Sequence, residues 1–406
     1  MPALRRLATA TATVIAAAAL AGCNTTTDPS PAPNRPGGVQ YPKSDAVPNA
    51  TLEVAHAFTG PQYPVGVAVS RTGRMFVAYP RWEDPVQFTV GEVRDGKEVA
   101  YPSQEMNSGE NDPEKLFSAQ SVVVDPADRL WVVDTGSVDM KPHKGPQWPK
   151  LVGIDLTTNK VFKTIHFPPT VAHAGTYLND VRFDLRRGAE GTAYITDSSV
   201  GGPNGIIVVD LASGRSIRRL SGHPSTEADK TFAAQMEGEP MLQRKPGEPP
   251  KQALIGSDGI AVSADGSRVF YCPLSSRTLY SVDAAVLADP SKSDADVAAT
   301  IRSEKRTFAS DGLDADAQGR VYLTDWEHNA VVVRNPDGQF RTLVHDERLW
   351  WPDSLSIGAD GYLYVSATQL HRQRKYHNGE DRRQRPFTFY KVKAGATPVT
   401  QTVGGQ

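Results

Sequence analysis

The feature that most constrains how this chain can fold is an internal repeat that occurs six times. Each copy is a short apolar strand, a tight turn rich in Asp and Gly, and a second apolar or aromatic strand, which is the pattern of a β-hairpin. The copies begin near Val65, Ser121, Asn179, Ser257, Ser310 and Pro352. One copy is too small to bury its own apolar face, so the copies have to pack against one another. The repeat therefore predicts an all-β fold, a six-bladed β-propeller.

Two further strands are predicted at the ends of the repeat region, over residues 52–58 and 387–392. We expect the N-terminal strand to complete the last blade and close the ring, because this pairing leaves no sheet edge exposed. The propeller is predicted to span residues 51–395, followed by a C-terminal tail over 396–406. The long gap between the third and fourth copies is expected to be an excursion, with a short helix over 226–236.

The N-terminus has the pattern of a bacterial lipoprotein signal. Arg5 and Arg6 precede an apolar, Ala-rich stretch that ends in Leu-Ala-Gly-Cys at residues 20–23. In such a motif, small residues admit the signal peptidase and the Cys thiol receives a diacylglycerol anchor. We therefore expect a signal peptide over residues 1–22, lipidation of Cys23, and a Thr-, Pro- and Gly-rich flexible tether over 23–50. This arrangement predicts a body outside the cytoplasm, anchored in the cell envelope to a bacterial membrane.

Charge and cysteine content exclude several classes of protein. The chain has 44 Lys and Arg residues against 46 Asp and Glu residues, a formal net charge of −2. No basic stripe alternates with aromatic residues, so no nucleic-acid partner is expected. Apart from Cys23, the only cysteine is Cys272. We therefore expect a monomer without an internal disulfide, stabilised by packing alone.

Aspartates occupy two different places in the repeat. Asp265 and Asp360 lie between the paired strands, where turn geometry explains them. A second set of residues, with one Asn among the Asp residues, precedes the innermost strands of four blades: Asn179, Asp258, Asp311 and Asp353. The closed ring should bring these four residues to one mouth of the channel. Crowded carboxylates need a cation, a basic partner or raised pKa values. One interpretation is that these four residues bind a divalent cation, most suitably calcium; the other is that each Asp only caps its loop.

Aromatic and histidine side chains are predicted near the same mouth. Trp350 and Trp351 directly precede the strand that carries Asp353, and His173 and His328 fall near predicted strand ends. We expect one Trp ring to stack on a planar ligand and the other to be buried between blades. The sequence contains no phosphate-binding loop, zinc-binding helix or nucleophile elbow, and no organic cofactor is expected.

Short motifs along the chain also carry a resemblance to a known family. They include RLWVVDTG at residues 129–136, YLNDV at 177–181, AYITDS at 193–198, GIIVVD at 205–210 and FYCPLSSRTLYSV at 270–282. In this order they resemble the yellow/major royal jelly protein family, over roughly residues 65–392. The resemblance implies a six-bladed propeller, which the repeat count indicates independently. Insect members have been associated with pigment chemistry, dopachrome conversion and the binding of small amines in the channel.

A more distant resemblance is to the gluconolactonase/senescence marker protein group, which are calcium-dependent lactone hydrolases. It implies metal and substrate positions at Asn179, Asp258 and Asp311. That group has a Glu before its first blade strand, where this chain has Tyr63 and Pro64. One charged ligand is therefore missing, and Asp353 is the residue that can replace it from another blade.

Three functions remain open from the sequence. The leading expectation is a cell-envelope propeller that binds a small molecule at one mouth of its channel. The alternative is a metal-dependent lactone or ester hydrolase, in which Asp311 is the catalytic residue that activates water. The third is a protein-interaction scaffold that uses loops such as residues 101–117. A metal with an open coordination site would favour hydrolysis, and an aromatic funnel would favour binding.

Overall fold

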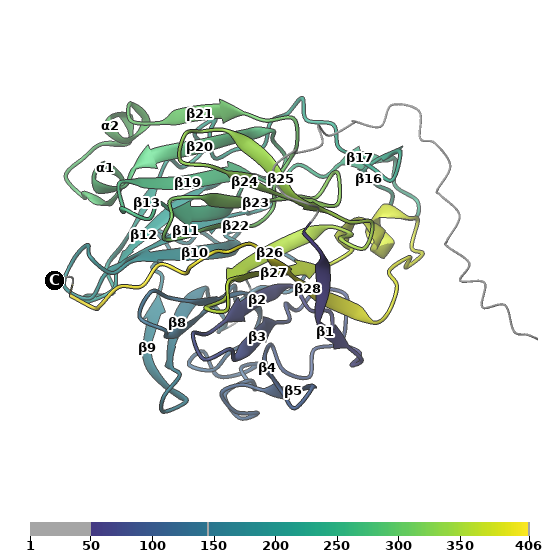
Figure 1. Ribbon diagram of the computed structural model, residues 1–406, viewed down its shortest axis with the longest axis horizontal. Helices are drawn as coiled ribbons and strands as arrows, with labels where there is room; N and C mark the ends of the chain where they lie inside the picture. The colour runs from purple at the N-terminus through teal and green to yellow at the C-terminus, as the bar shows by residue number, and fades with distance from the viewer. Residues whose placement is uncertain (1–49, 144–145, 405–406) are drawn as a thin grey trace, which may run out of the picture. The chain divides into compact units, whose positions relative to one another are not determined.

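The computed structural model describes residues 50–143 and 146–404, and the strands of this part form six four-stranded antiparallel sheets (Figure 1). The first three sheets are β2 (Gly66–Val69), β3 (Met75–Ala78), β4 (Val90–Arg94) and β5 (Lys97–Ala100); β6 (Ala119–Val124), β7 (Leu130–Asp134), β8 (Lys150–Asp155) and β9 (Lys160–His166); and β10 (Leu178–Asp184), β11 (Thr192–Asp197), β12 (Gly205–Asp210) and β13 (Ser216–Arg219). The other three are β18 (Ser257–Val262), β19 (Arg268–Pro273), β20 (Thr278–Asp283) and β21 (Arg302–Lys305); β22 (Leu313–Ala315), β23 (Val321–Asp325), β24 (Ala330–Arg334) and β25 (Phe340–His345); and β26 (Pro352–Ile357), β27 (Tyr362–Ala367), β28 (Phe387–Lys393) and β1 (Leu52–Phe58).

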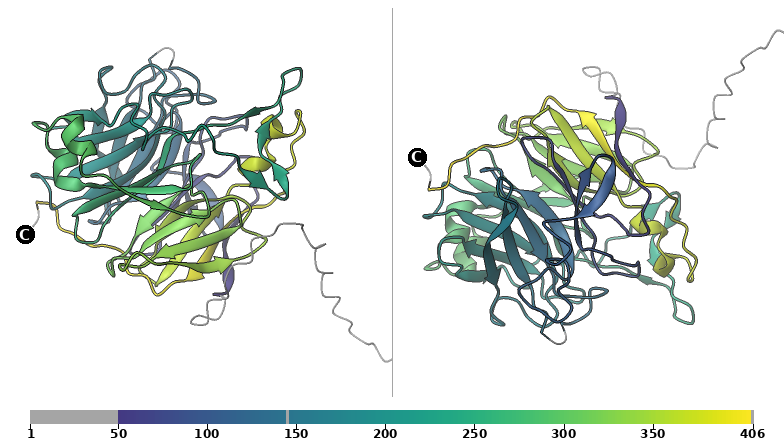
Figure 2. Two further views of the ribbon diagram at one scale, coloured as in Figure 1. Left: turned by 90° about the horizontal axis from the view of Figure 1, so that it is seen from above. Right: turned by 90° about the horizontal axis from the view of Figure 1, so that it is seen from below.

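The six sheets form a closed ring. Each innermost strand packs against the next, in the order β2, β6, β10, β18, β22, β26 and back to β2. The last sheet contains the N-terminal strand, because β1 pairs with β28 from Leu52 opposite Val392 to Phe58 opposite Phe387. In both views of Figure 2 the purple β1 lies beside the yellow C-terminal sheet. The predicted six-bladed propeller and its closure by the N-terminal strand are confirmed.

The core lies between the blades. Six apolar clusters fill the six interfaces between neighbouring sheets. Because side chains alternate along a strand, one strand serves two interfaces. In β7, Leu130 and Val132 pack towards the preceding blade, whereas Trp131 and Val133 pack towards the following one. This use of both faces explains why the repeat consists of nearly continuous apolar runs.

The excursion between the third and fourth blades differs from its prediction. The expected helix over 226–236 is wrong: the Asp229 carboxylate accepts the Thr231 N–H at 2.9 Å in a turn that competes with helix. Short strand pairs follow, β14 (Gln235–Met236) with β15 (Glu239–Pro240) and β16 (Leu242–Gln243) with β17 (Lys251–Gln252). Phe232 and Met236 pack in one cluster with Trp351 and Tyr376. We call residues 225–256 and 368–385, which include the 3₁₀ turns η1 (Leu370–Arg372) and η2 (Arg374–Tyr376), the lid.

Two short helices lie between β20 and β21, α1 (Ala284–Ala288) and α2 (Asp294–Ala298). Within the described residues, no helix is long and apolar enough to cross a membrane. The predicted signal peptide, Cys23 and the tether up to residue 49 lie outside the described residues.

The C-terminal residues lie against the propeller. The Ala317 N–H donates to the Thr397 carbonyl at 2.9 Å, and the Gln401 N–H donates to the Pro126 carbonyl at 2.9 Å. The Gln401 side chain accepts the Leu185 N–H at 2.6 Å. Residues 398–401 also line a cavity of about 90 Å³ together with Val69, Val124, Val262 and Ile357, which are the last residues of four innermost strands. We call residues 396–404 the C-terminal strap; it lies at the mouth opposite the predicted acidic site.

Candidate functional site

The mouth that carries the predicted site is built from irregular strand starts. Register shifts occur at the start of β10, β18 and β26, between Leu178 and Val181, Ser257 and Ile260, and Pro352 and Leu355. In the fifth blade, β22 begins only at Leu313, after Asp311 and Gly312. A bulge changes the direction of a side chain and is common beside functional sites. These bulges contain or adjoin the residues that the sequence predicts at the mouth.

Hydroxyl groups from the second strand hold three of these strand starts. Thr196 Oγ1 accepts the Asp180 N–H at 3.2 Å, and Thr324 Oγ1 accepts the Asp311 N–H at 3.0 Å. Ser366 Oγ accepts the Ser354 N–H at 2.9 Å. Each hydroxyl therefore satisfies an N–H group that the irregular pairing removes from the ladder.

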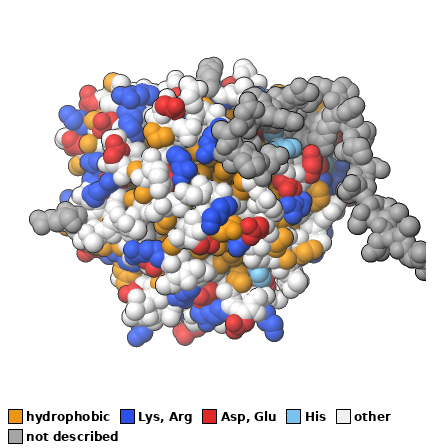
Figure 3. Space-filling view, viewed as in Figure 1, with side chains coloured by type: hydrophobic (Ala, Val, Ile, Leu, Met, Phe, Trp, Pro, Cys, Tyr) orange, Lys and Arg blue, Asp and Glu red, His pale blue; other side chains and the backbone are white. Residues whose placement is uncertain are grey.

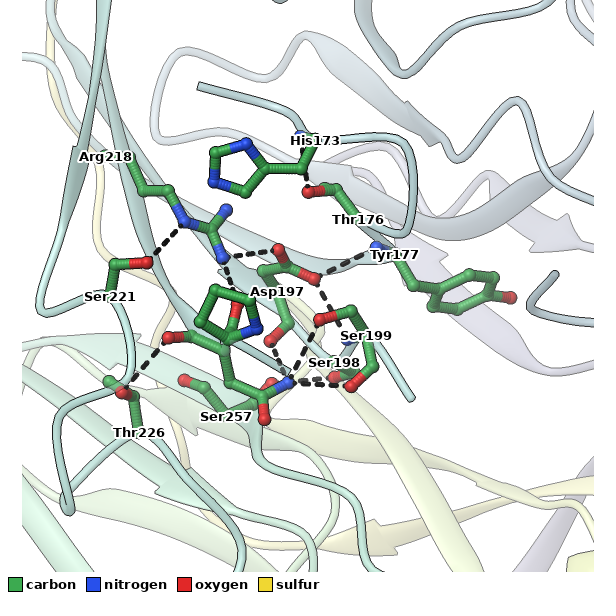
Figure 4. A network of polar contacts seen from close by, with 12 residues as sticks. His173, Thr176, Tyr177, Asp197, Ser198, Ser199, Arg218, Ser221, Thr226 and Ser257 are labelled. Atoms are coloured by element: carbon green, nitrogen blue, oxygen red, sulfur yellow. Dashed lines mark hydrogen bonds and ion pairs between the residues drawn. The ribbon is translucent and has the colours of Figure 1, made fainter. Parts of the chain in front are cut away.

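The aspartate that follows Thr196 in the AYITDS motif holds the loop before the innermost strand. Asp197 Oδ1 accepts the N–H groups of Tyr177 and Ser199, each at 2.9 Å. Arg218 forms an ion pair with Asp197 Oδ2 at 2.7 Å, so the carboxylate lies between Arg218 and the backbone of Tyr177 (Figure 4). This buried aspartate positions the strand that carries Asn179 and does not need a ligand to balance its charge.

Asp134 repeats this arrangement in the second blade. Its Oδ2 accepts the Phe117 N–H at 2.7 Å, its Oδ1 accepts the Ser118 N–H at 3.0 Å, and Lys150 Nζ lies 2.9 Å from Oδ2. Burial alone would raise the pKa of Asp134, but the Lys150 charge and the backbone N–H groups outweigh burial and lower the pKa. The aspartate of the RLWVVDTG motif is therefore also a structural residue.

The two kinds of Asp-Gly in the repeat have different causes. Gly266 and Gly361 have φ values of +72° and +81°, as tight turns require. At the mouth, a Cβ on Gly259 would lie 2.0 Å from the Asp311 carbonyl oxygen, and one on Gly312 would lie 2.3 Å from that of Asp353. Glycine follows Asp258 and Asp311 because the next blade approaches too closely for any side chain.

Three carboxyl groups from three blades converge at this mouth. Asp258, Asp311 and Asp353, which we call the mouth acids, are 3 %, 8 % and 6 % exposed. Asp258 and Asp311 interact strongly enough for each to change the pKa of the other, and Asp353 is close enough to repel both. Ser198 Oγ lies 3.2 Å from Asp258 Oδ2 and also accepts Asn179 Nδ2 at 2.8 Å. The structure thus brings the four residues predicted as metal ligands into one region, with Asn179 joined through Ser198.

The mouth acids lack a basic partner. Burial raises the pKa of Asp311 to about 6, although hydrogen bonds from Trp351 and Asp258 lower it. Burial and repulsion by Asp311 raise the pKa values of Asp258 and Asp353 well above their usual range. Within residues 50–143 and 146–404, no Lys, Arg or His forms an ion pair with these carboxyl groups. Two or three negative charges at this mouth would be uncompensated, so the site favours protons or a cation.

Deeper in the channel one guanidinium is shared by two carboxyl groups. Arg182 Nη1 lies 2.7 Å from Asp180 Oδ1, and Arg182 Nε lies 3.6 Å from Asp314 Oδ1. Burial raises the pKa of Asp314 to about 6, and Arg182 limits the rise. Arg182 and Asp314 were not predicted from the sequence. Their pairing could have been predicted in part, because side chains alternate along a strand and Asp180 and Arg182 therefore lie on one face of β10.

The aromatic residues predicted to bind ligand occupy different environments. Trp351 is buried; its ring stacks on Trp326 at 4.3 Å, and its Nε1 donates to Asp311 Oδ2 at 2.8 Å. It therefore supports a mouth acid through its edge. Trp350 is half-buried, with the Arg372 guanidinium 3.7 Å from its ring centroid.

The predicted histidines bond within their own blades. His173 Nδ1 lies 3.2 Å from the Pro169 carbonyl in the loop before β10. His328 Nδ1 lies 2.9 Å from Asp325 Oδ1. Burial lowers the pKa of His328, but the Asp325 bond and charge outweigh burial and raise it. Neither of these two contacts reaches a mouth acid.

Aromatic residues that the sequence analysis missed lie near the mouth acids. Trp82 Nε1 donates to the Tyr177 hydroxyl at 2.9 Å, and that hydroxyl donates to Gln120 Oε1 at 2.7 Å. Burial raises the pKa of Tyr177, and the charges of Asp258 and Asp353 raise it further, so the Tyr177 hydroxyl interacts electrostatically with these two acids. Tyr177 belongs to the YLNDV motif and lies directly before the bulge. This position in the sequence could have identified it as a residue of the mouth.

Comparison with known proteins agrees with this architecture. Residues 117–398 match the family described as major royal jelly protein. A Protein yellow from Drosophila pseudoobscura pseudoobscura is 26% identical over 261 residues, which cover 61% of this chain and 45% of the relative. The chain thus spans about half the length of the curated relatives it matches.

Solved structures with the same architecture have low sequence identity. A luciferin-regenerating enzyme is 11% identical with a TM-score of 0.51, covering 86% of this chain and 99% of that chain. A gluconolactonase from Xanthomonas campestris is 13% identical with a TM-score of 0.48, covering 88% of this chain and 98% of that chain. The first likeness shows the fold alone.

Proposed function

The chain belongs to the major royal jelly protein family, and from this membership and the mouth acids we propose that it binds a small, positively charged molecule at one mouth of the propeller channel. Three buried carboxyl groups without a basic partner carry this proposal. A cation supplies the missing charge and displaces the protons that the acids hold in its absence. Binding is therefore coupled to proton release and strengthens as pH rises through about 6, the pKa of Asp311.

Aromatic rings at the mouth favour an organic cation. The Lys375 ammonium lies 5.8 Å from the ring centroid of Trp82, so this ring already takes part in a cation–π contact, which an ammonium ligand would share or displace. Trp82 is joined to Tyr177, which lies near Asp258 and Asp353. An ammonium group at the acids with an aromatic body against these rings would use both features.

Tyramine and 4-ethylphenol form a matched pair of probes, because they differ in the ammonium group. We expect tyramine to raise the melting temperature at pH 7.5, to do so less at pH 5, and to bind more tightly than 4-ethylphenol. Asp353→Asn should abolish the difference between the two probes. Asp265→Asn, in an exposed hairpin turn, should preserve it. Equal binding of both probes, or no effect of Asp353→Asn, would contradict an ammonium site.

A calcium-dependent hydrolase is the second candidate, and the oxygen-only donor set favours it. Asn179 and the mouth acids offer carboxylate and amide oxygens, which suit calcium. Among the described residues, no group of three or more acidic, His or Cys side chains is already arranged to hold a metal ion. A bound ion would polarise a lactone or ester carbonyl. Asp311 would accept a proton from the attacking water.

Calcium binding and hydrolysis are tested separately from tyramine binding. After chelator treatment, calcium should raise the melting temperature of the wild type and of Asp265→Asn, but not of Asp311→Asn. Hydrolysis of δ-gluconolactone should then depend on calcium and be lost in Asp311→Asn. A calcium response that is equal in both variants, or absent from all three proteins, would reject this candidate.

We also propose that Cys23 anchors the propeller to a bacterial membrane in the cell envelope. Two acyl chains give stable attachment where one chain is marginal. Cys23→Ser should release the protein into the soluble fraction or leave the precursor unprocessed, as seen by fractionation and mass spectrometry. Mature Cys23→Ser protein that still sediments with membranes would refute the anchor.

A further inference from the structure

A second cavity, of about 390 Å³, lies in the lid, and none of the mouth acids lines it. Its walls come from β14 to β16 and from the turns η1 and η2. Backbone bonds hold the two parts of the lid together: the Arg244 N–H donates to the Lys375 carbonyl, and the Asn378 N–H donates to the Arg244 carbonyl, each at 2.8 Å. The walls are thus built by two segments that are distant in sequence. The volume is in the range of a small-molecule site.

Two buried nitrogen atoms at this cavity, one of them an N–H donor of Arg372, lack a hydrogen-bond partner within the described residues. His371 is 4 % exposed, and its Nδ1 has no hydrogen-bond partner among the described residues. Its Nε2 lies 3.4 Å from Glu237 Oε2, while its ring stacks on Trp351. Arg372 donates through Nη2 to Glu237, but its Nε is buried and likewise unpartnered within the described part of the chain. A buried donor without an acceptor costs free energy, which a ligand oxygen would recover.

Three arginines line the cavity together with Glu237 and Glu239, and one of these arginines, Arg244, forms no ion pair within the described residues. Arg244 reaches backbone carbonyls, those of Leu242 at 3.4 Å and Pro240 at 3.3 Å. Neither contact supplies a negative charge. Arg382, which also lines the cavity, pairs with Glu380 at 2.9 Å. Guanidinium groups in this setting bind planar or tetrahedral oxyanions.

We propose that the lid cavity is a second binding site, for a small organic molecule that carries a carboxylate or phosphate group. Arg244 and Arg372 bind the oxyanion, and the His371 ring lies beside them. Met236, Met241, Leu242 and Tyr376 form the apolar wall that receives the rest of the molecule. A bare inorganic ion would leave this wall without a contact, so the ligand has an apolar part.

Benzoate, phenyl phosphate and neutral benzamide are probes that separate charge from shape, and binding is measured by isothermal titration calorimetry on the full chain. We expect benzoate or phenyl phosphate to bind with a stoichiometry of one, and benzamide at least about tenfold more weakly. Arg244→Gln should lower the affinity for the oxyanion by about tenfold, because it removes a positive charge. Arg244 has no ion-pair partner in the described structure, so the substitution leaves no carboxylate unpaired. Arg215→Gln is the matched control, since the Arg215 side chain donates to Ser213 and does not line the cavity. It should change nothing.

A second variant acts in the opposite direction. Glu237→Gln removes the carboxylate that competes for Arg372 and His371, so oxyanion binding should tighten. Asp353→Asn should leave the affinity for the oxyanion unchanged, because Asp353 belongs to the mouth acids and does not line this cavity. Benzamide binding as tightly as benzoate, no binding of either oxyanion to the wild type or Glu237→Gln, or equal effects of Arg244→Gln and Arg215→Gln would each overturn the proposal.

Discussion

At the scale of single residues, the mouth acids make the stability of the propeller depend on pH. The folded-state pKa of Asp311 is about 6, above the usual value of 3.8. Between these values the folded state holds more protons than the unfolded state, so the free energy of unfolding falls as pH rises. The loss begins near pH 4 and, for Asp311, is complete a little above pH 6. It amounts to about 3 kcal/mol at neutral pH.

Asp311→Asn should therefore stabilise the protein in the absence of ligand. The amide has no charge to bury, and its oxygen can still accept the Trp351 N–H. We expect the free energy of unfolding to rise by about 1–3 kcal/mol at pH 7.5 and to be unchanged at pH 4, measured by urea denaturation. Asp265→Asn is the control, because hydrogen bonds from Ser263 and Ser267 lower the pKa of Asp265. Stabilisation of the same size at both pH values would show that charge is not the cause.

At the scale of elements, the hairpins were predictable because each carries its own local signal. The turn at Gly266 and the bounds of β1 follow from turn residues and from apolar runs that local sequence contains. The helices α1 and α2 were missed because five residues are too few to show an apolar period. Their caps were the remaining signal: Asp283 accepts two N–H groups of α1, and Ser293 forms a capping box with Asp296.

The candidate site was predictable only in part. The position of each Asp before an innermost strand is a local property, and ring closure then places Asp258, Asp311 and Asp353 together. Their partners depend on packing between blades: Trp351 donates to Asp311 from a ring that is held by its stack on Trp326. Such contacts join residues that are far apart in the sequence, and no regular spacing between them predicts the contact. Sequence reasoning therefore found the acids and missed most of the groups that support them.

Removing residues 51–59 tests the closure of the ring. This deletion uncovers β28 and exposes the apolar surface that Leu52 and Phe58 bury, worth about 3–6 kcal/mol. We expect a large fall in the free energy of unfolding by urea denaturation, with aggregation through the new edge. Removing residues 24–48 should leave stability nearly unchanged, because their composition predicts a tether. Equal losses from the two deletions would count against closure by β1.

At the scale of the whole molecule, the two mouths of the channel are different. One mouth carries uncompensated acids and aromatic rings, and the lid shares Trp351 with it. The other mouth carries the C-terminal strap, which bonds to the second, third and fifth blades. On the face shown in Figure 3, acidic and basic side chains are interspersed, with no continuous region of one charge. A charged ligand is therefore expected to enter through the mouth that carries the acids.

Truncation after Gly395 tests the role of the strap. It removes the acceptors of the Ala317 and Leu185 N–H groups, and hydrogen exchange at these two amides should become much faster. At least five hydrogen bonds are lost, two of them between Thr397 and Gln318, so the free energy of unfolding should fall by about 3–7 kcal/mol. The response to tyramine should be retained, because the mouth acids lie at the other ends of the innermost strands. Truncation after Thr402 is the control and should change neither amide. Loss of the tyramine response in the chain truncated after Gly395 would show instead that the strap supports the acidic mouth. Unchanged hydrogen exchange at Leu185 would show that the strap does not protect the mouth at which it lies.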